Sequence, residues 1–255
     1  MKNTKNNILQ HWNQRSRMAR QAGSNDFVAK DIEIQAIGKY IKNGQKILEI
    51  GCGNGETALQ FARKHKVKIL GLDFSEGMIR SARKNATRSK LKGNVRFEVS
   101  DVRSLDLKDK YDIIFSERVL INLPDWYSQA RAIKTIVRHL RKGGKYLMCE
   151  NSQEGLDAIN IMRHACGLTK IISPWHNRYL KDIEISKLVI KGARIEKIEH
   201  YSSTYYFISR VVNAWLANLK GLEPKYNAIV NKLALYLPPL GDFGQGRLWI
   251  WRKTN

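Results

Sequence analysis

Hydrophobic positions along this chain follow two different periods in turn, which predicts strands separated by helices. Residues 45–50 (QKILEI) and 68–74 (KILGLDF) are short apolar runs typical of buried strands. In residues 125–140 the apolar side chains recur every three or four positions, as on one face of an amphipathic helix. The same reasoning predicts helices at 33–42, 56–65, 76–87, 154–166, 183–190 and 208–236, and strands at 95–102, 111–115, 144–150, 194–206 and 247–252.

Strands that alternate with amphipathic helices usually form a parallel sheet with helices on both faces. We therefore predict an α/β fold with a doubly wound, Rossmann-like sheet. Residues 1–43 are interpreted as an N-terminal arm or lid, and residues 44–255 as one domain. Within that domain, segments at about 169–182 and 207–240 are expected to close over a substrate.

A glycine-rich turn lies between the first strong strand and the next helix, in residues 49–55 (EIGCGNG). Glycines there allow a sharp turn and let a ligand approach the backbone, although an ordinary tight turn has the same residues. Asp73 ends the next strand, where an acid accepts hydrogen bonds from ribose hydroxyls. Asp101 and Val102 end the third strand, where an acid and an apolar side chain suit adenine. The pattern indicates a nucleoside ligand at the carboxyl edge of the sheet.

Five ordered segments between residues 47 and 151 carry a family resemblance: ILEIGCGNGETALQFA, ILGLDFSEGMIRSARKN, VRFEVSDVRSL, YDIIFSERVLINLPDW and LRKGGKYLMCEN. Together they resemble the successive motifs of class I S-adenosylmethionine (SAM)-dependent methyltransferases. The resemblance implies a seven-stranded sheet with an antiparallel last strand and SAM lying across the strand ends. The residues expected to bind this cofactor are Glu49, Gly51, Cys52, Gly53, Asp73, Phe74, Asp101, Val102 and Glu117.

The competing functions share part of this pattern. A dehydrogenase has the same fold, but its fingerprint is Gly-x-Gly-x-x-Gly, whereas this turn reads Gly-x-Gly-x-Gly. A non-catalytic SAM-binding protein is a third interpretation, and the intact Gly51, Gly53 and Asp73 argue against it.

The segments that flank the five motifs more loosely resemble bacterial methyltransferases that accompany surface-polysaccharide and sugar biosynthesis. These segments are NQRSRMARQAGSNDFVAKDIE and SQEGLDAINIMRHACGLTKIISPWHNRYL. This second resemblance implies an O-methyltransferase whose acceptor is a sugar, a sugar nucleotide or a similar small polar molecule, including phosphate-bearing ones.

Net charge adds an alternative acceptor. Forty-five Lys and Arg against 23 Asp and Glu give a formal charge of +22, which suits nucleic acid, an anionic membrane surface or a phosphorylated substrate. Three dense basic clusters, within residues 63–68, 80–92 and 138–145, fall near predicted helix C-termini. They therefore lie on the opposite edge of the sheet from the ligand, which favours a solvated surface. RNA methylation, on ribose or base, remains the alternative. Residues 116–120 (SERVL) lack the Asn/Asp-Pro-Pro-aromatic motif of base-amine methylation.

Methyl transfer from a sulfonium is an in-line displacement, and an oxygen acceptor usually also needs a general base. Candidates at the carboxyl edge are His176, Glu117 and Glu150, with His176 flanked by aromatic side chains. For His176, the competing interpretation is a loop histidine that only hydrogen-bonds the nearby backbone. No cluster of Asp, Glu or His has metal-ligand spacing, so no metal is predicted.

The cysteines and the absence of a recognisable targeting segment indicate where in the cell the protein is expected. The three cysteines are too scattered for a disulfide scaffold or a zinc site, and neither a signal peptide nor a membrane span is recognised. A cytoplasmic protein is expected.

Overall fold

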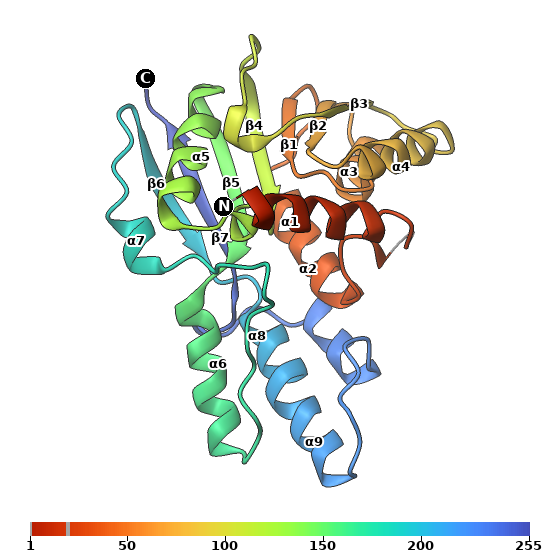
Figure 1. Ribbon diagram of the computed structural model, residues 1–255, viewed down its shortest axis with the longest axis vertical. Coiled ribbons are helices and arrows are strands. Elements are labelled where there is room, and N and C mark those ends of the chain that lie inside the picture. Colours follow the sequence, from red (N-terminus) through yellow and green to blue (C-terminus); the bar gives the residue numbers. More distant parts are fainter. Residues whose placement is uncertain (1, 19–20) are drawn as a thin grey trace.

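A seven-stranded sheet forms the centre of the computed structural model, which describes residues 2–18 and 21–255 (Figure 1). Its strand order is β3-β2-β1-β4-β5-β7-β6. The pairs among β1 to β5 are parallel, whereas β7 runs antiparallel to both of its neighbours. The predicted fold class is therefore confirmed. The strands are β1 (Lys46–Ile50), β2 (Lys68–Asp73), β3 (Asn94–Val99), β4 (Tyr111–Glu117), β5 (Leu140–Asn151), β6 (Ala193–Glu199) and β7 (Gly246–Lys253).

Helices cover both faces of this sheet, so the core has two parts. Alternate residues of each strand point to opposite faces, so Leu248 and Ile250 join one core while Trp249 and Trp251 join the other. The helices are α1 (Lys2–Arg15), α2 (Phe27–Gly38), α3 (Glu56–Lys64), α4 (Glu76–Thr87), α5 (Trp126–Arg138), α6 (Gln153–Ala165), α7 (Asp182–Ser186), α8 (Ser203–Tyr206) and α9 (Asn213–Leu219). Short 3₁₀ or π turns are η2 (Val102–Ser104), η3 (Leu120–Asn122), η4 (Phe207–Val212) and η5 (Ile229–Leu235).

The predicted N-terminal arm contains two helices, and its residues 1, 19 and 20 lie outside the described part of the chain. The second helix begins at Phe27, earlier than the predicted 33–42, because the side chain of Asp26 accepts a hydrogen bond from the amide of Ala29 at 3.0 Å. Such an N-cap satisfies a helix amide that has no partner within the helix.

The prediction of a strand over 194–206 is wrong beyond Glu199. The predicted strand includes Tyr205 and Tyr206, and aromatic residues are common in strands. In the structure both side chains are buried in the same one of the two cores, whereas consecutive strand residues would face opposite sides of the sheet. They form α8, a single helical turn.

The helices predicted on either side of that strand are also shorter than expected. The helix predicted at 183–190 is the five-residue α7. The helical region predicted at 208–236 breaks after Leu219, near Gly221 and Pro224, and resumes at η5. Glycine and proline are the residues that most often interrupt a helix.

Two parts of the chain project together from the end of the sheet where β5 leads into α6 (Figure 1). They are α6 and residues 207–240, which lie between β6 and β7 and include η4, α9 and η5. We call them the appendage. It contains one of the two segments predicted to cover a substrate.

The basic clusters lie at the amino ends of the strands. Lys66 and Lys68 are at the start of β2, Lys92 precedes β3, and Lys142 and Lys145 lie in the first half of β5. Arg83 is not merely solvated: its guanidinium donates two hydrogen bonds, at 3.0 and 2.8 Å, to the carbonyl of Phe97. Within residues 2–18 and 21–255, no helix is both long and apolar enough to cross a membrane.

Candidate active site

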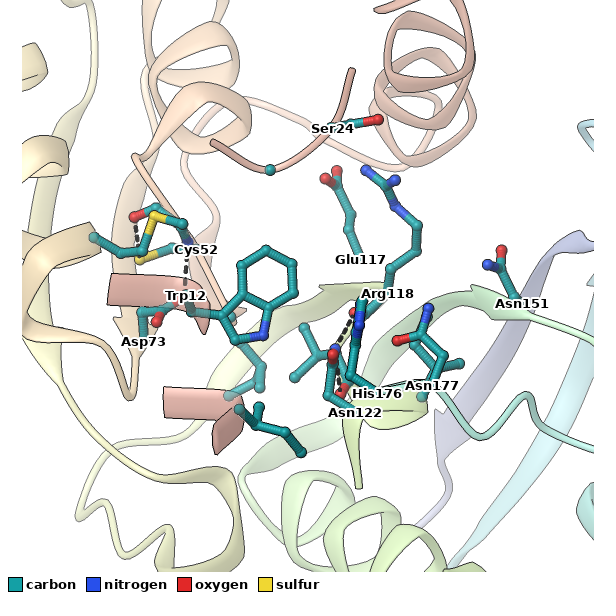
Figure 2. Close-up of a pocket in the computed structure, with 18 of the residues that line it drawn as sticks. Trp12, Ser24, Cys52, Asp73, Glu117, Arg118, Asn122, Asn151, His176 and Asn177 are labelled. Atoms are coloured by element: carbon teal, nitrogen blue, oxygen red, sulfur yellow. Dashed lines mark hydrogen bonds between the residues drawn. The ribbon is translucent and has the colours of Figure 1, made fainter. Parts of the chain in front are cut away.

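A cavity of about 630 Å³ opens at the carboxyl edge of the parallel strands. The β1–α3 turn, the ends of β2 and β4, and η2 line one part of it. Residues from α1, α2, the segment 174–179 and the appendage line the rest. In Figure 2, Cys52 and Asp73 lie at one end and Asn151 and Asn177 at the other, with Trp12 between them. We call these the glycine-turn end and the asparagine end.

Three glycines in the β1–α3 turn have positive φ, each in a different setting. A Cβ on Gly51 (φ 68°) would lie 2.2 Å from a methyl carbon of Val119, and one on Gly55 (φ 80°) 2.6 Å from the ring of Phe97. A Cβ on Gly53 (φ 52°) would meet no atom within 4 Å, and Gly53 lines the cavity. The backbone at Gly53 is therefore open to close approach by a ligand.

Asp73, the last residue of β2, points its carboxylate at this turn. It is 8% exposed and accepts hydrogen bonds from the amides of Gly53 and Ser75, both at 2.9 Å. Burial raises the pKa of Asp73 to about 6, and the two amide bonds oppose that rise. Each carboxylate oxygen keeps a second lone pair, which suits a ligand hydroxyl.

The other residues predicted at this end also lie on the cavity wall. Phe74, Asp101 and Val102 line it. The Asp101 carboxylate forms an ion pair with Arg103 and accepts hydrogen bonds from its guanidinium. The sequence did not single out Arg103.

Glu117, at the end of β4, forms an ion pair with Lys30 of α2 and accepts a hydrogen bond from Thr57 Oγ1 at 3.1 Å. Its Oε1 is buried and has no hydrogen-bond partner in the described chain. Glu49 of β1 lies in the same cluster, where burial raises its pKa and the charge of Lys30 opposes the rise. Its Oε2 likewise has no partner among the described residues.

Arg118, the next residue, has a backbone φ of 55°, the only positive value for a non-glycine residue in the described chain. Such strain persists where the surroundings enforce it; here the Arg118 amide donates to the carbonyl of Cys149 at 2.8 Å. The guanidinium pairs with Glu33 of α2 at 3.2 Å. Its Nε is buried and finds no acceptor in the described residues. In the sequence, the position of Arg118 directly after a central strand is the signal that points to it as a site residue.

Helix α1 lies over the cavity. Asn13 Oδ1 accepts a hydrogen bond from the Ser75 hydroxyl at 2.6 Å. Ser16 packs where Gly77 leaves room, because a Cβ there would lie 2.5 Å from Ser16 Oγ. Ile8 and Trp12 both line the cavity, so α1 forms part of its wall.

His176 contributes to the cavity as part of an aromatic cluster. Its ring lies 4.7 Å from that of His11, 5.2 Å from that of Trp175 and 6.1 Å from that of Trp12. Burial lowers the pKa of His176, and the nearby His11 and Arg15 lower it further. Its buried Nδ1 has no partner in the part of the chain that is described. The lowered pKa favours the uncharged ring near neutral pH.

The third predicted base, Glu150, does not line the cavity. Its fully buried carboxylate accepts hydrogen bonds from Ser116 Oγ at 2.9 Å and from the amides of residues 119–121 at 3.1 to 3.4 Å. Burial raises its pKa to about 7. Glu150 therefore supports the turn after β4 rather than facing a ligand.

Two further arginines reach the cavity. Arg210 of η4 pairs with Asp26 at 2.6 Å and lies over the ring of Tyr226 at 4.4 Å. Arg15 of α1 donates to neutral oxygens, among them the Ala22 carbonyl at 2.8 Å. Burial lowers the pKa of Arg15, and the charge of Arg118 lowers it further. Among the described residues Arg15 donates only to neutral oxygens, so it adds a positive charge without a carboxylate partner to the cavity wall.

Both predicted covering segments contribute to the cavity. His176, Asn177 and Tyr179 come from 169–182, and Arg210 and Tyr226 from 207–240. Within the described residues, no three His, Cys, Asp or Glu side chains are grouped as metal ligands.

A family model described as a methyltransferase domain matches residues 41–201, more than half of the chain. The chain belongs to the class I SAM-dependent methyltransferases. SAM is the methyl donor of this family. The methyltransferase fold extends beyond the matched region: the magnesium protoporphyrin IX methyltransferase of Synechocystis PCC 6803, crystallised with SAH, aligns over 98% of this chain and 99% of its own, with TM-score 0.62 and 17% identity.

Curated methyltransferases are similar over a shorter stretch. The 27-O-demethylrifamycin SV methyltransferase of Amycolatopsis mediterranei is 32% identical over 107 residues, 41% of this chain and 38% of that protein. Phosphoethanolamine N-methyltransferase 1 of Arabidopsis thaliana is 32% identical over 111 residues, 43% of this chain and 22% of that protein. The chain thus spans less than half the length of these relatives.

The histidine environment of this methyltransferase generates a testable expectation. In nuclear magnetic resonance titrations, His176 should titrate below the ordinary pKa of about 6.5, because burial and the nearby Arg15 disfavour the imidazolium. Arg15→Gln should shift the titration to higher pH, whereas Arg131→Gln, a change on the exposed surface of α5, should not. A His176 resonance that titrates above pH 6.5 would contradict this environment.

Proposed function

We propose that this methyltransferase transfers the SAM methyl group to a hydroxyl of a small polar acceptor, a sugar, a sugar nucleotide or a related glycan precursor, that carries an anionic group. One observation carries the proposal: a single cavity joins a nucleoside-type site to a part lined by His176 and by Arg118, whose buried Nε has no partner among the described residues. SAM supplies an electrophilic methyl group on a sulfonium; the protein's residues bind, orient and accept a proton.

The residues at the glycine-turn end fit SAM. Gly53 leaves open backbone, and the Asp73 carboxylate keeps lone pairs for the two ribose hydroxyls. Asp101 and Val102 are assigned to the adenine, and Gly51, Cys52 and Phe74 to the wall around the cofactor. The unpartnered Glu49 Oε2 and Glu117 Oε1 are suitable acceptors for the positively charged methionine part.

His176 is assigned as the general base. A base must be unprotonated before it takes a proton, and the lowered pKa of His176 favours that state near neutral pH. Glu117 is the second candidate, but one of its oxygens is already held by Lys30 and Thr57. Glu150 is not assigned a catalytic role, because amides and the Ser116 hydroxyl occupy its carboxylate.

Charge at the asparagine end supports an anionic acceptor. In Figure 2 the backbone of Arg118 lies beside Asn122, and its guanidinium lies beside the carboxylate of Glu117. Arg118 retains an unpartnered Nε, and Arg15 donates to neutral oxygens. A guanidinium edge with free N–H groups is well suited to carboxylate or phosphate.

Two further observations favour a small acceptor. Two relatives are named for small acceptors, phosphoethanolamine and 27-O-demethylrifamycin SV, and the first of these bears a phosphate. The basic clusters lie at the strand amino ends, away from the cavity, which counts against RNA as the acceptor.

The cofactor assignment is tested by Asp73→Ala. The change removes a charged acceptor for the ribose hydroxyls, so SAM affinity should fall by roughly 2–4 kcal/mol. Asp73→Asn should cost less, and Asp106→Ala, at an exposed acid, nothing. Isothermal titration calorimetry measures all three. Unchanged affinity in a folded Asp73→Ala variant would remove Asp73 from the cofactor site.

The base assignment is tested by His176→Ala, which should lower kcat by about 10²–10⁴-fold and leave SAM affinity nearly intact. The wild-type rate should rise with pH through a pKa below 6.5 and then level off, because only the neutral ring accepts a proton. His164→Ala, at an exposed histidine on α6, is the matched control. A variant that raises only the acceptor KM and keeps the wild-type pH profile would exclude His176 as the base and shift the assignment to Glu117.

The acceptor class is tested by measuring SAH formation with sugar phosphates, sugar nucleotides, the matching uncharged sugars and transfer RNA. Turnover should be found with the anionic small molecules. With the best of them, Arg118→Gln and Arg15→Gln should each raise KM at least about tenfold, because each loses a charge-assisted hydrogen bond. Arg131→Gln should not. Turnover confined to uncharged sugars, or to RNA, would overturn the proposal.

A further inference from the structure

The outer face of α9 is apolar. Its inner residue Ala214 is buried, whereas Trp215, Leu216 and Leu219 are 41%, 41% and 63% exposed. These three occupy neighbouring positions at i, i+1 and i+4 on one helix face. A helix on the surface of a water-soluble domain normally turns a polar face outward. The described residues leave this apolar face only partly covered.

The turn η5 has the same pattern. Asn231 and Ala234 are buried, while Ile229 and Leu233 are 83% and 54% exposed. More than half of the large apolar side chains exposed in the described chain lie in residues 207–240, and the others of this segment are Phe207, Leu222, Tyr226, Tyr236, Leu237 and Leu240. A concentration of this kind marks an interaction surface rather than scattered surface residues.

The charges beside this surface are basic. Lys220, Lys225 and Lys232 are exposed within the segment, and Glu223 is its only acid. Lys170, in the loop that follows α6, is also exposed. Apolar and aromatic side chains interleaved with lysine are the composition of helices that lie in a membrane interface, where lysines meet anionic headgroups.

We propose that the appendage docks peripherally on a membrane surface that contains anionic lipid. A peripheral contact follows from length, because α9 has seven residues and a spanning helix needs about 20. A second copy of the chain is the less suitable occupant, since two chains of formal charge +22 repel each other, whereas an anionic surface attracts each of them.

The docking surface is continuous with the wall of the cavity. Arg210 and Tyr226 belong to the appendage and line the cavity, and α6 begins where β5 ends, at the same edge of the sheet. Docking therefore brings the cavity near the membrane surface. This inference stands on the appendage alone and does not depend on which molecule is methylated.

The experiment is co-sedimentation of the full chain with vesicles of phosphatidylcholine alone, or with phosphatidylglycerol at about a three-to-one ratio. The chain should bind the mixed vesicles at least about tenfold more tightly than the neutral ones, and added salt should weaken that binding. Leu219→Ser with Leu222→Ser should weaken binding at least about tenfold, because both apolar side chains are lost from the contact.

Two variants serve as matched controls. Ile183→Ser with Val189→Ser removes two comparably exposed apolar residues outside the appendage, and Lys84→Gln with Arg88→Gln removes two charges near the end of α4. Both should keep binding within about twofold. Thermal unfolding by circular dichroism confirms that every variant is folded, independently of SAM.

Three results would overturn the proposal. The first is absence of binding to the anionic vesicles. The second is a loss of binding in either control as large as in the Leu219/Leu222 variant. The third is light scattering that shows a dimer dispersed by Leu219→Ser with Leu222→Ser, which would assign the surface to a second copy.

Discussion

One face of α2 holds the walls of the cavity together. Asp26, Lys30 and Glu33 are spaced four and three residues apart, so they lie on the same side of the helix. Asp26 binds Arg210 in the appendage, while Lys30 and Glu33 bind the consecutive residues 117–118 at the end of β4. A single helix thus fastens the sheet edge to the segment inserted between β6 and β7. These ion pairs therefore connect elements on different sides of the cavity.

Burying charged groups in ion pairs has a cost in desolvation free energy, and that cost is useful at a binding site. Burial of an ion removes its water, and a single partner replaces only part of that hydration. Glu117 and Arg118 each keep a buried atom without a partner in the described chain. His176 and Asn177 do the same. Folding has therefore already removed water from groups that a ligand can hydrogen-bond. This is what makes a site preorganised.

How much of this the sequence predicts depends on whether a feature is local. The glycine turn and Asp73 are set by residues close together along the chain, next to strands that the apolar pattern reveals. Arg15 reaches the cavity only because α1 lies over it, and a one-dimensional pattern does not reveal which helix covers the sheet edge. Glu150 shows the converse: its strand end was predicted, but the amides that occupy its carboxylate belong to a turn whose geometry only the structure reveals.

The segment between β6 and β7 illustrates a different limit. Its apolar residues predict a helical region, and a helix that is apolar on all sides is expected to be buried. In the structure the small Ala214 faces inward and the larger Trp215, Leu216 and Leu219 face outward, so packing within the chain uses the smaller apolar side. The sequence pattern therefore predicts burial, whereas in the single chain the larger apolar side chains face water. Exposed apolar area is unfavourable in water. The exposure of these side chains is therefore a property of the isolated chain, and a surface that covers them removes their contact with water.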